Sequence, residues 1–276
     1  MEHIQILFEN IKDDKKDILI ALLADIGFDG FEEEQQNLKA LIAATKFNES
    51  LFDNIIQIND VKYLKSIIKE ENWNEKWESD FEPVAVNHPN TNEPFAFIRA
   101  DFHQPNPSFL HDISVTPKMS FGTGHHATTH LMVAYMSEID FKNKSVIDFG
   151  TGTGVLAILA EKLGASCIVG IDNDSWSIHN AKENIVVNDC HNIKLEKAET
   201  ITEGLKAEII LANINLNIIK ENMSAIISAA ENTATYLFSG IMLHDKNKIE
   251  TILQDAHLTI ETIKEKNGWL LIKAKN

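Results

Sequence analysis

The glycine-rich segment at residues 148–154 is the feature that most constrains the fold of this 276-residue chain. It reads Asp-Phe-Gly-Thr-Gly-Thr-Gly, follows a short apolar run at 145–148 and precedes apolar residues at helical spacing from Leu156 to Leu163. Glycine permits a sharp backbone turn and a close approach of the backbone to a ligand. The pattern therefore predicts a strand, a ligand-binding loop and a helix, the building unit of an α/β fold.

The spacing of the glycines separates two kinds of cofactor. A dinucleotide-binding fingerprint needs its third glycine at position 155, where this chain has Val155, and here the motif also begins with an acid, Asp148. A carboxylate is unfavourable beside a pyrophosphate but favourable beside the ammonium and sulfonium groups of S-adenosylmethionine. We therefore predict S-adenosylmethionine as the cofactor, with Gly150 and Gly152 in its binding loop.

A second acid, Asp172, lies 22 residues after Gly150, at the end of a predicted strand. A carboxylate in this place can accept hydrogen bonds from both ribose hydroxyls of a cofactor. Nicotinamide enzymes use a similarly placed acid, so the preference for the methyl donor depends on the glycine spacing and Asp148. In the alternative interpretation the glycines are ordinary turns and Asp172 caps a helix, although Asp174 is better placed as that cap.

Asn213 follows the predicted strand at 208–211. Ligands of open α/β sheets bind beyond the carboxyl ends of the strands, where the strand order reverses, and the first and fourth strands would flank that point. The side-chain oxygen of Asn213 could accept a hydrogen bond from a substrate amine or from the cofactor. The alternative is an asparagine that only forms a turn.

Residues 121–130 read Phe-Gly-Thr-Gly-His-His-Ala-Thr-Thr-His and precede a predicted helix. Thr128 or Thr129 could cap that helix and reach into the cleft. His126 and His130 are four residues apart, which is compatible with a metal site on one helix face. No H-E-x-x-H pattern or cysteine cluster accompanies them. We therefore predict a loop over the ligand and no metal.

The C-terminal half alternates strands with helices. Further strands are predicted at 167–171, 193–195, 208–211 and 236–238, and a closing hairpin at 258–263 and 269–272 around a Lys-Asn-Gly turn. This order predicts a Rossmann-like α/β domain with seven strands, mostly parallel, covered by helices on both faces and ending in an antiparallel edge hairpin.

The N-terminal part predicts a smaller α+β domain at residues 1–82. Strands are expected at 4–8, 28–34 and 38–44, and helices at 18–26, 51–58 and 64–68. All six prolines of the chain lie between Pro83 and Pro117. We interpret 83–117, in which the apolar segments 95–98 and 113–115 could pair as strands, as a linker with a hinge between residues 1–82 and a catalytic domain at 118–276. The alternative is a loop-rich part of one domain.

The charge balance limits the class of partner. The chain has 25 Lys and Arg against 41 Asp and Glu, a formal net charge of -16. This argues against sequence-specific nucleic-acid binding, which uses clustered basic residues, and favours a basic protein partner. No apolar run reaches the roughly 18 residues that span a bilayer, and two cysteines make no disulfide framework. We expect a cytoplasmic protein that contacts no membrane.

Several segments together resemble one known family. Residues 146–154 resemble motif I of the seven-strand S-adenosylmethionine-dependent methyltransferases. Residues 119–129 resemble the loop of the bacterial methyltransferases that modify the eleventh protein of the large ribosomal subunit, the PrmA family. The same family is matched by Ala212-Asn213-Ile214, Ser239-Gly240-Ile241 and Trp73-Asn-Glu-Lys-Trp77.

The resemblance implies a function and a set of site residues. Members of this family trimethylate lysine side chains and the N-terminal amine of the ribosomal protein, free or on the ribosome, and dock it with an N-terminal ferredoxin-like domain. Their cofactor residues correspond to Thr129, Gly150, Asp172 and Asn213, and Gly152 belongs to the same loop. We assign Asn213 the further role of positioning the amine, and expect a monomer.

The reaction so implied is the in-line attack of a neutral amine on the sulfonium methyl group, for which positioning supplies much of the catalysis. Three rival functions remain open at this point. The first is methylation of another protein, a small molecule or RNA. The second is a nicotinamide-dependent oxidoreductase, but Val155 and Asp148 do not fit the dinucleotide-binding fingerprint. The third is a non-catalytic binding module.

Overall fold

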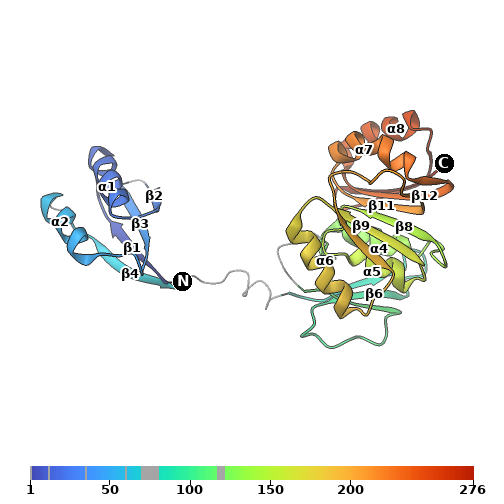
Figure 1. Cartoon of the computed structure of the whole chain (residues 1–276), viewed down its shortest axis with the longest axis horizontal. Coiled ribbons are helices and arrows are strands. Elements are labelled where there is room, and N and C mark those ends of the chain that lie inside the picture. Colours follow the sequence, from blue (N-terminus) through green and yellow to red (C-terminus); the bar gives the residue numbers. More distant parts are fainter. Residues whose placement is uncertain (1, 12, 35, 60, 70–80, 117–121) are drawn as a thin grey trace. The chain divides into compact units, whose positions relative to one another are not determined.

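The structure, a computed structural model, describes residues 2–276 except 12, 35, 60, 70–80 and 117–121 (Figure 1). The chain divides into two compact units, Met1–Trp77 and Glu78–Asn276. Within the described residues, no helix is both long and apolar enough to cross a membrane.

The first unit is a four-stranded antiparallel sheet with two helices. Its elements in chain order are β1 (Glu2–Phe8), α1 (Asp13–Asp25), β2 (Gly30–Glu34), β3 (Asn37–Ala43), α2 (Glu49–Asn59) and β4 (Leu64–Lys69). The strand order is β2-β3-β1-β4, and neighbouring strands are antiparallel. Alternate residues of β3 are buried, which places one face of the sheet on a core that includes Phe8, Leu19 and Phe52.

The expectation of a helix at 64–68 is wrong, because this segment is strand β4 and pairs antiparallel with β1. Apolar residues three and four apart in so short a segment fit a helix and a strand equally well. Leu64 and Ile67 are largely exposed, so neither belongs to a buried helix face. Pairing with β4 instead satisfies the backbone groups along the second edge of β1.

The second unit contains the predicted seven-stranded sheet. Its strands are β8 (Ser145–Phe149), β9 (Cys167–Asp172), β10 (Ile193–Lys197), β11 (Ala207–Asn213), β12 (Ala230–Met242), β13 (Thr259–Lys266) and β14 (Trp269–Lys275). The order is β10-β9-β8-β11-β12-β14-β13. The pairs from β10 to β12 are parallel, and β14 pairs antiparallel with both β12 and β13.

Both faces of this sheet are buried. Val146 and Ile209 pack into a core shared with α4 (Ala127–Met136), α5 (Val155–Lys162) and the end of α6 (Ser175–Val187). The alternate residues Ile147 and Ile210 pack against α7 (Leu216–Ser228) and α8 (Lys246–Asp255). In Figure 1, α7 and α8 accordingly lie on one side of the sheet and α4, α5 and α6 on the other.

A three-stranded sheet corrects the predicted domain boundaries. It consists of β5 (Val84–Asn87), β6 (Pro94–Arg99) and β7 (His111–Ser114), and Val86, Ile98 and Ile113 are fully buried in the core that α4 and α5 share. Residues 83–117 therefore belong to the second unit and do not separate it from the first. Proline is compatible with this sheet because Pro94 is the first residue of its strand, where proline is tolerated.

Candidate active site

Three strand ends bring the predicted site residues to one edge of the large sheet. Strands β9, β8 and β11 are parallel neighbours, and Phe149 of β8 is in register with Ile171 of β9 and Ala212 of β11. The chain passes from β8 to β9 on one side, whereas β11 lies on the other, so the strand order reverses at this point. Asp172 and Asn213, the last residues of β9 and β11, therefore flank the glycine loop, as predicted.

The glycine loop has a conformation that other residues adopt only with strain. Gly150, Gly152 and Gly154 have φ angles of 83°, 52° and 80°. A Cβ atom on Gly150 would lie 2.2 Å from Cγ2 of Ile214. The backbone N–H groups of Gly150 and Thr151 both donate to the carbonyl of Ile171, at 2.8 and 2.9 Å. The loop is thus bound to the end of β9 and passes close to the residue after Asn213.

Asp148 lies at the start of this loop and is fully buried. Its Oδ2 accepts a hydrogen bond of 2.7 Å from the Thr151 hydroxyl, whereas Oδ1 has no hydrogen-bond partner in the described part of the chain. Burial raises the pKa of Asp148 to about 7; the Thr151 hydrogen bond opposes this rise, and the charge of Asp172 adds to it. With a pKa near 7 this carboxyl titrates close to neutral pH, and its unpartnered oxygen can accept a hydrogen bond from a cationic group.

Asp172 is held by the backbone of two neighbouring loops. Its Oδ2 accepts from the N–H of Gly152 at 2.9 Å, and its Oδ1 accepts from the N–H of Asp174 at 3.0 Å. Each carboxylate oxygen can accept a further hydrogen bond. Asp174, not Asp172, caps α6, because its Oδ2 accepts from the N–H of Ser177 at 3.0 Å. The carboxylate of Asp172 is therefore fixed in orientation without being used as a helix cap.

Asn213 and Thr129 meet although they are 84 residues apart in the chain. Nδ2 of Asn213 donates to Oγ1 of Thr129 at 3.3 Å, which joins the end of β11 to the first turn of α4. Thr129 is fully buried. This hydrogen bond orients the side-chain amide of Asn213 with its NH₂ group toward α4. The side-chain oxygen Oδ1 of Asn213 can then accept a hydrogen bond from a ligand.

The start of α4 differs from the prediction that Thr128 or Thr129 caps it. Both threonines lie inside the helix, and His126 is the cap residue, with Nδ1 accepting from the N–H of Thr128 at 3.4 Å. Nδ1 also lies 2.8 Å from the Thr128 hydroxyl. The His126 ring packs edge-on against Trp269, with 4.8 Å between ring centroids. Histidine is not a typical helix cap, so sequence preference pointed to the threonines.

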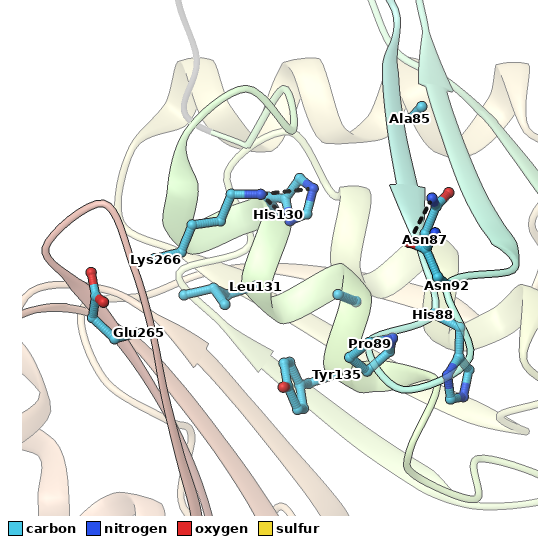
Figure 2. A pocket seen from close by; sticks show the side chains of 11 residues that line it. Ala85, Asn87, His88, Pro89, Asn92, His130, Leu131, Tyr135, Glu265 and Lys266 are labelled. Atoms are coloured by element: carbon cyan, nitrogen blue, oxygen red, sulfur yellow. Dashed lines mark hydrogen bonds between the residues drawn. The ribbon is translucent and has the colours of Figure 1, made fainter.

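His130 lines a pocket of about 340 Å³ between α4, the β5–β6 turn and the end of β13 (Figure 2). Nζ of Lys266 lies 3.1 Å from each ring nitrogen of His130. Burial, followed by the charge of Lys266, lowers the pKa of His130, and burial lowers the pKa of Lys266. No group of three potential metal ligands occurs among the residues that the structure describes. His126 and His130 have separate contacts there.

These residues fit S-adenosylmethionine. The unpartnered oxygen of Asp148 suits a cationic ligand, Asp172 can accept from two ribose hydroxyls, and the loop between them contains Gly150, Gly152 and Gly154, which carry no side chains. The seven-stranded α/β sheet carries this set at the point where its strand order reverses. Fold and site together define an S-adenosylmethionine-dependent methyltransferase.

Comparisons with known proteins specify the family. The family described as ribosomal protein L11 methyltransferase (PrmA) matches residues 9–276. The chain therefore belongs to this family. Ribosomal protein L11 methyltransferase of Porphyromonas gingivalis is 35% identical over 265 residues, covering 93% of this chain and 89% of its own. The protein of the same description from Chlorobaculum parvum is 36% identical, covering 99% and 97%.

A solved structure agrees with this membership. The ribosomal protein L11 methylase of Lactobacillus delbrueckii subsp. bulgaricus superposes with a TM-score of 0.62 at 27% sequence identity. The match covers 69% of this chain and 97% of that one. The fold over this share of the chain is thus one that a family member has in a solved structure.

Sequence reasoning missed two residues that organise the site, Thr153 and Asn184. Both are fully buried, and the amide of Asn184 donates to the Thr153 carbonyl at 2.8 Å. Thr153 lies within the glycine loop, but its role depends on contacts with residues 31 positions away on each side. The signal that could have indicated Asn184 is an asparagine at a buried helix position, where a polar side chain needs a partner.

Proposed function

We propose that this chain transfers methyl groups from S-adenosylmethionine to lysine side chains and to the N-terminal amine of ribosomal protein L11. The observation that carries the proposal is the Asn213–Thr129 pair at the edge of the sheet where Asp148, Asp172 and the glycine loop converge. Membership of the ribosomal protein L11 methyltransferase family supports the substrate. Bound S-adenosylmethionine supplies an activated methyl group on a positively charged sulfur.

The residues that hold the cofactor follow from its chemistry. Gly150 and Gly152 have positive φ angles and carry no side chain, so a ligand can approach their backbone, and the Asp172 carboxylate accepts from ribose hydroxyls. The orphaned oxygen of Asp148 attracts the positive end of the ligand. Thr129 acts by fixing Asn213 through the 3.3 Å hydrogen bond.

The amine of the substrate must be neutral before each transfer. A lysine side chain has a pKa of about 10.4 in water, and exclusion from water favours its uncharged form. In the first and second transfers to one nitrogen, the carbonyl oxygen of Asn213 can accept an N–H of this amine and so orient the nitrogen lone pair. Orientation of this kind, rather than a strong base, is the role we assign to Asn213.

The first unit completes the proposal. Its strand–helix–strand–strand–helix–strand order and antiparallel sheet support a ferredoxin-like domain, to which we assign the docking of L11. We expect the enzyme to act as a monomer in the cytoplasm, where ribosomal proteins are made. The formal net charge of -16 favours a lysine-rich substrate over RNA.

The role of Asn213 is tested by replacing it with alanine in the full-length chain. We expect turnover on L11 to fall at least about tenfold, the effect of losing one oriented hydrogen bond, with a smaller change in affinity for S-adenosylhomocysteine. Thr129→Val removes the hydroxyl with little change of shape, so it should cause a smaller loss in the same direction. Full turnover in Asn213→Ala would contradict the assignment.

A further inference from the structure

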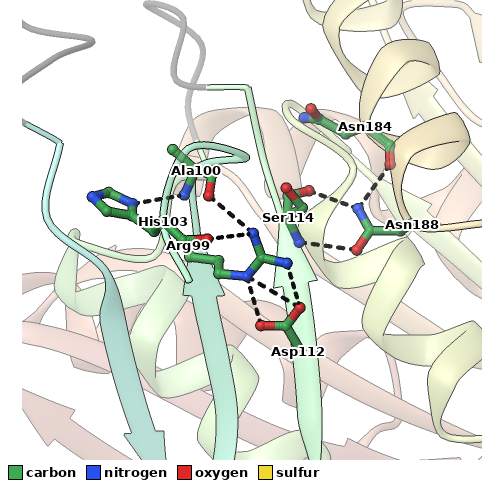
Figure 3. A network of polar contacts seen from close by, with 7 residues as sticks. All are labelled: Arg99, Ala100, His103, Asp112, Ser114, Asn184 and Asn188. Atoms are coloured by element: carbon green, nitrogen blue, oxygen red, sulfur yellow. Dashed lines mark hydrogen bonds and ion pairs between the residues drawn. The ribbon is translucent and has the colours of Figure 1, made fainter. Parts of the chain in front are cut away.

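Asn184 of α6 and Asn188, the residue at the C-terminal cap of this helix, lie on the same side of it, because they are four residues apart. Asn188 binds the backbone of Ser114 at the end of β7 (Figure 3). Its Oδ1 accepts from the N–H of Ser114 at 3.0 Å, and its Nδ2 donates to the Ser114 carbonyl at 2.6 Å. Nδ2 of Asn188 also donates to the carbonyl of Asn184 at 2.8 Å, so Asn188 joins the C-terminal end of α6 to the small sheet.

Asn184 makes a different pair of contacts one turn earlier. Its Oδ1 accepts from the N–H of Thr116 at 2.8 Å, and its Nδ2 donates to the carbonyl of Thr153 at 2.8 Å. The side chain is fully buried. Both its donor and its acceptor are thus used to join the segment that follows β7 to the glycine loop. Removing either partner would leave a buried polar group unsatisfied.

Thr153 also contacts Gly122, which follows Thr116 in the chain. Its hydroxyl donates to the carbonyl of Gly122 at 2.9 Å. A Cβ atom on Gly122, which has a φ of 110°, would lie 2.6 Å from this hydroxyl oxygen, so the approach depends on glycine. Thr116 and Gly122 are therefore both bound to Thr153, the first through Asn184 and the second directly. Beyond Gly122 the chain leads into α4 and Thr129.

We propose that Thr153 and Asn184 are positioning residues that couple cofactor binding at the glycine loop to the placement of Thr116 and Gly122, and through them to the start of α4. A ligand that orders the glycine loop then stabilises these contacts, and the contacts in turn favour the loop conformation that binds the ligand. The proposal rests on the proposed function only in taking S-adenosylmethionine as the ligand of the loop.

Amide hydrogen exchange of the full-length chain, measured by NMR with and without S-adenosylhomocysteine, tests this coupling. The N–H of Thr116 bonds to Asn184, whereas that of Ser114 bonds to Asn188 and serves as a matched control on the same segment. General stabilisation by the ligand slows both amides alike. We expect the ligand to slow exchange at Thr116 about tenfold more than at Ser114. Equal slowing of the two amides would overturn the proposal.

Substitutions of Asn184, Asn188 and Thr153 distinguish a positioning role of these side chains from a general effect on folding. Asn184→Ala should remove the ligand-dependent slowing at Thr116, whereas Asn188→Ala should keep it, although each variant removes a side chain that holds the same segment to α6. Thr153→Val leaves the Thr153 carbonyl and Asn184 in place but removes the hydroxyl contact with Gly122. In that variant we expect kcat on the methyl acceptor to fall several-fold, and affinity for S-adenosylhomocysteine to fall as well, because the coupling is reciprocal. Unchanged kcat would contradict the role of the hydroxyl.

The exchange measurement needs no methyl acceptor. A wild-type chain that shows the selective slowing at Thr116 but fails to methylate L11 would therefore refute the proposed substrate and leave the coupling intact. If the chain methylates L11 but the ligand slows exchange at both amides equally, the coupling is refuted and the proposed substrate is left intact.

Discussion

The buried carboxyl of Asp148 gives the site a titration near neutral pH. Its pKa is raised from 3.8 to about 7, mainly by burial. The folded chain therefore holds a proton that the unfolded chain has released, and the free energy of unfolding falls as pH rises between these two values. Asp148→Asn removes this titration. Without cofactor, we expect the variant to be more stable than wild type above about pH 7, by on the order of a few kcal/mol.

Urea unfolding at about pH 5 and about pH 8 measures this difference, which should be larger at the higher pH. The same variant should bind S-adenosylhomocysteine more weakly, because a neutral amide attracts the ligand's ammonium group less than a carboxylate does. Equal stability of the two proteins at the higher pH would show that burial does not penalise the charged Asp148.

Most of the predicted site residues could be placed from sequence because each lies at the end of a strand. Gly150, Asp172 and Asn213 all follow apolar runs that form parallel strands, and parallel strands present their carboxyl ends at one edge. Thr153 and Asn184 could not be found in this way. Their roles come from hydrogen bonds across tertiary contacts, which a local sequence pattern does not encode.

At the scale of elements, the glycine loop and the segment after β11 are packed against each other at Ile214. A Cβ on Gly150 would meet the Ile214 side chain, whereas a Cβ on Gly240 would lie 2.4 Å from the Ile214 carbonyl oxygen. We expect Gly150→Ala and Gly240→Ala each to weaken S-adenosylhomocysteine binding about tenfold or more, since positive φ alone costs roughly 1–2 kcal/mol with a side chain present.

A second substitution distinguishes the two glycines. Ile214→Ala removes the side chain that Gly150→Ala meets, so it should restore part of the lost affinity, measured by calorimetry. The same change leaves the Ile214 backbone in place and should not rescue Gly240→Ala. Rescue of both variants, or of neither, would contradict the packing described for Ile214.

Periodicity predicted the elements of the large sheet better than those of the small ones. The strands of the large sheet are separated by helices and turns with clear signals, and its seven strands occur as expected. Strand β4 was mistaken for a helix because its short apolar pattern fits both. Residues 83–117 were interpreted as a linker because all six prolines lie there, yet the strands expected at 95–98 and 113–115 correspond to β6 and β7, Pro94 begins a strand, and Pro83, Pro89, Pro105 and Pro107 lie in connections.

At the scale of the whole molecule, the position of the small sheet predicts where the chain can be cut. A fragment of residues 78–276 retains β5 to β7 and should unfold cooperatively and bind S-adenosylhomocysteine as the full chain does. We expect it to methylate L11 more slowly, because it lacks the unit to which we assign docking. Circular dichroism with thermal unfolding, and calorimetry, measure these properties.

A fragment of residues 118–276, the catalytic domain expected from sequence, should fail to fold. It loses Val86, Ile98 and Ile113, which are fully buried in the core of the second unit. Each such side chain contributes about 1.5–3 kcal/mol when buried, and their removal also exposes apolar faces of α4 and α5. Cooperative unfolding of this shorter fragment would contradict the assignment of 83–117 to the second unit.

Transfer of a labelled methyl group from S-adenosylmethionine to purified proteins of the large ribosomal subunit tests the proposed activity most directly. With the full-length chain, we expect label on lysine side chains and the N-terminal amine of L11, located by mass spectrometry. Asn213→Ala should reduce the labelling strongly while the chain still binds S-adenosylhomocysteine. Label on another ribosomal component, with none on L11, would contradict the proposed function.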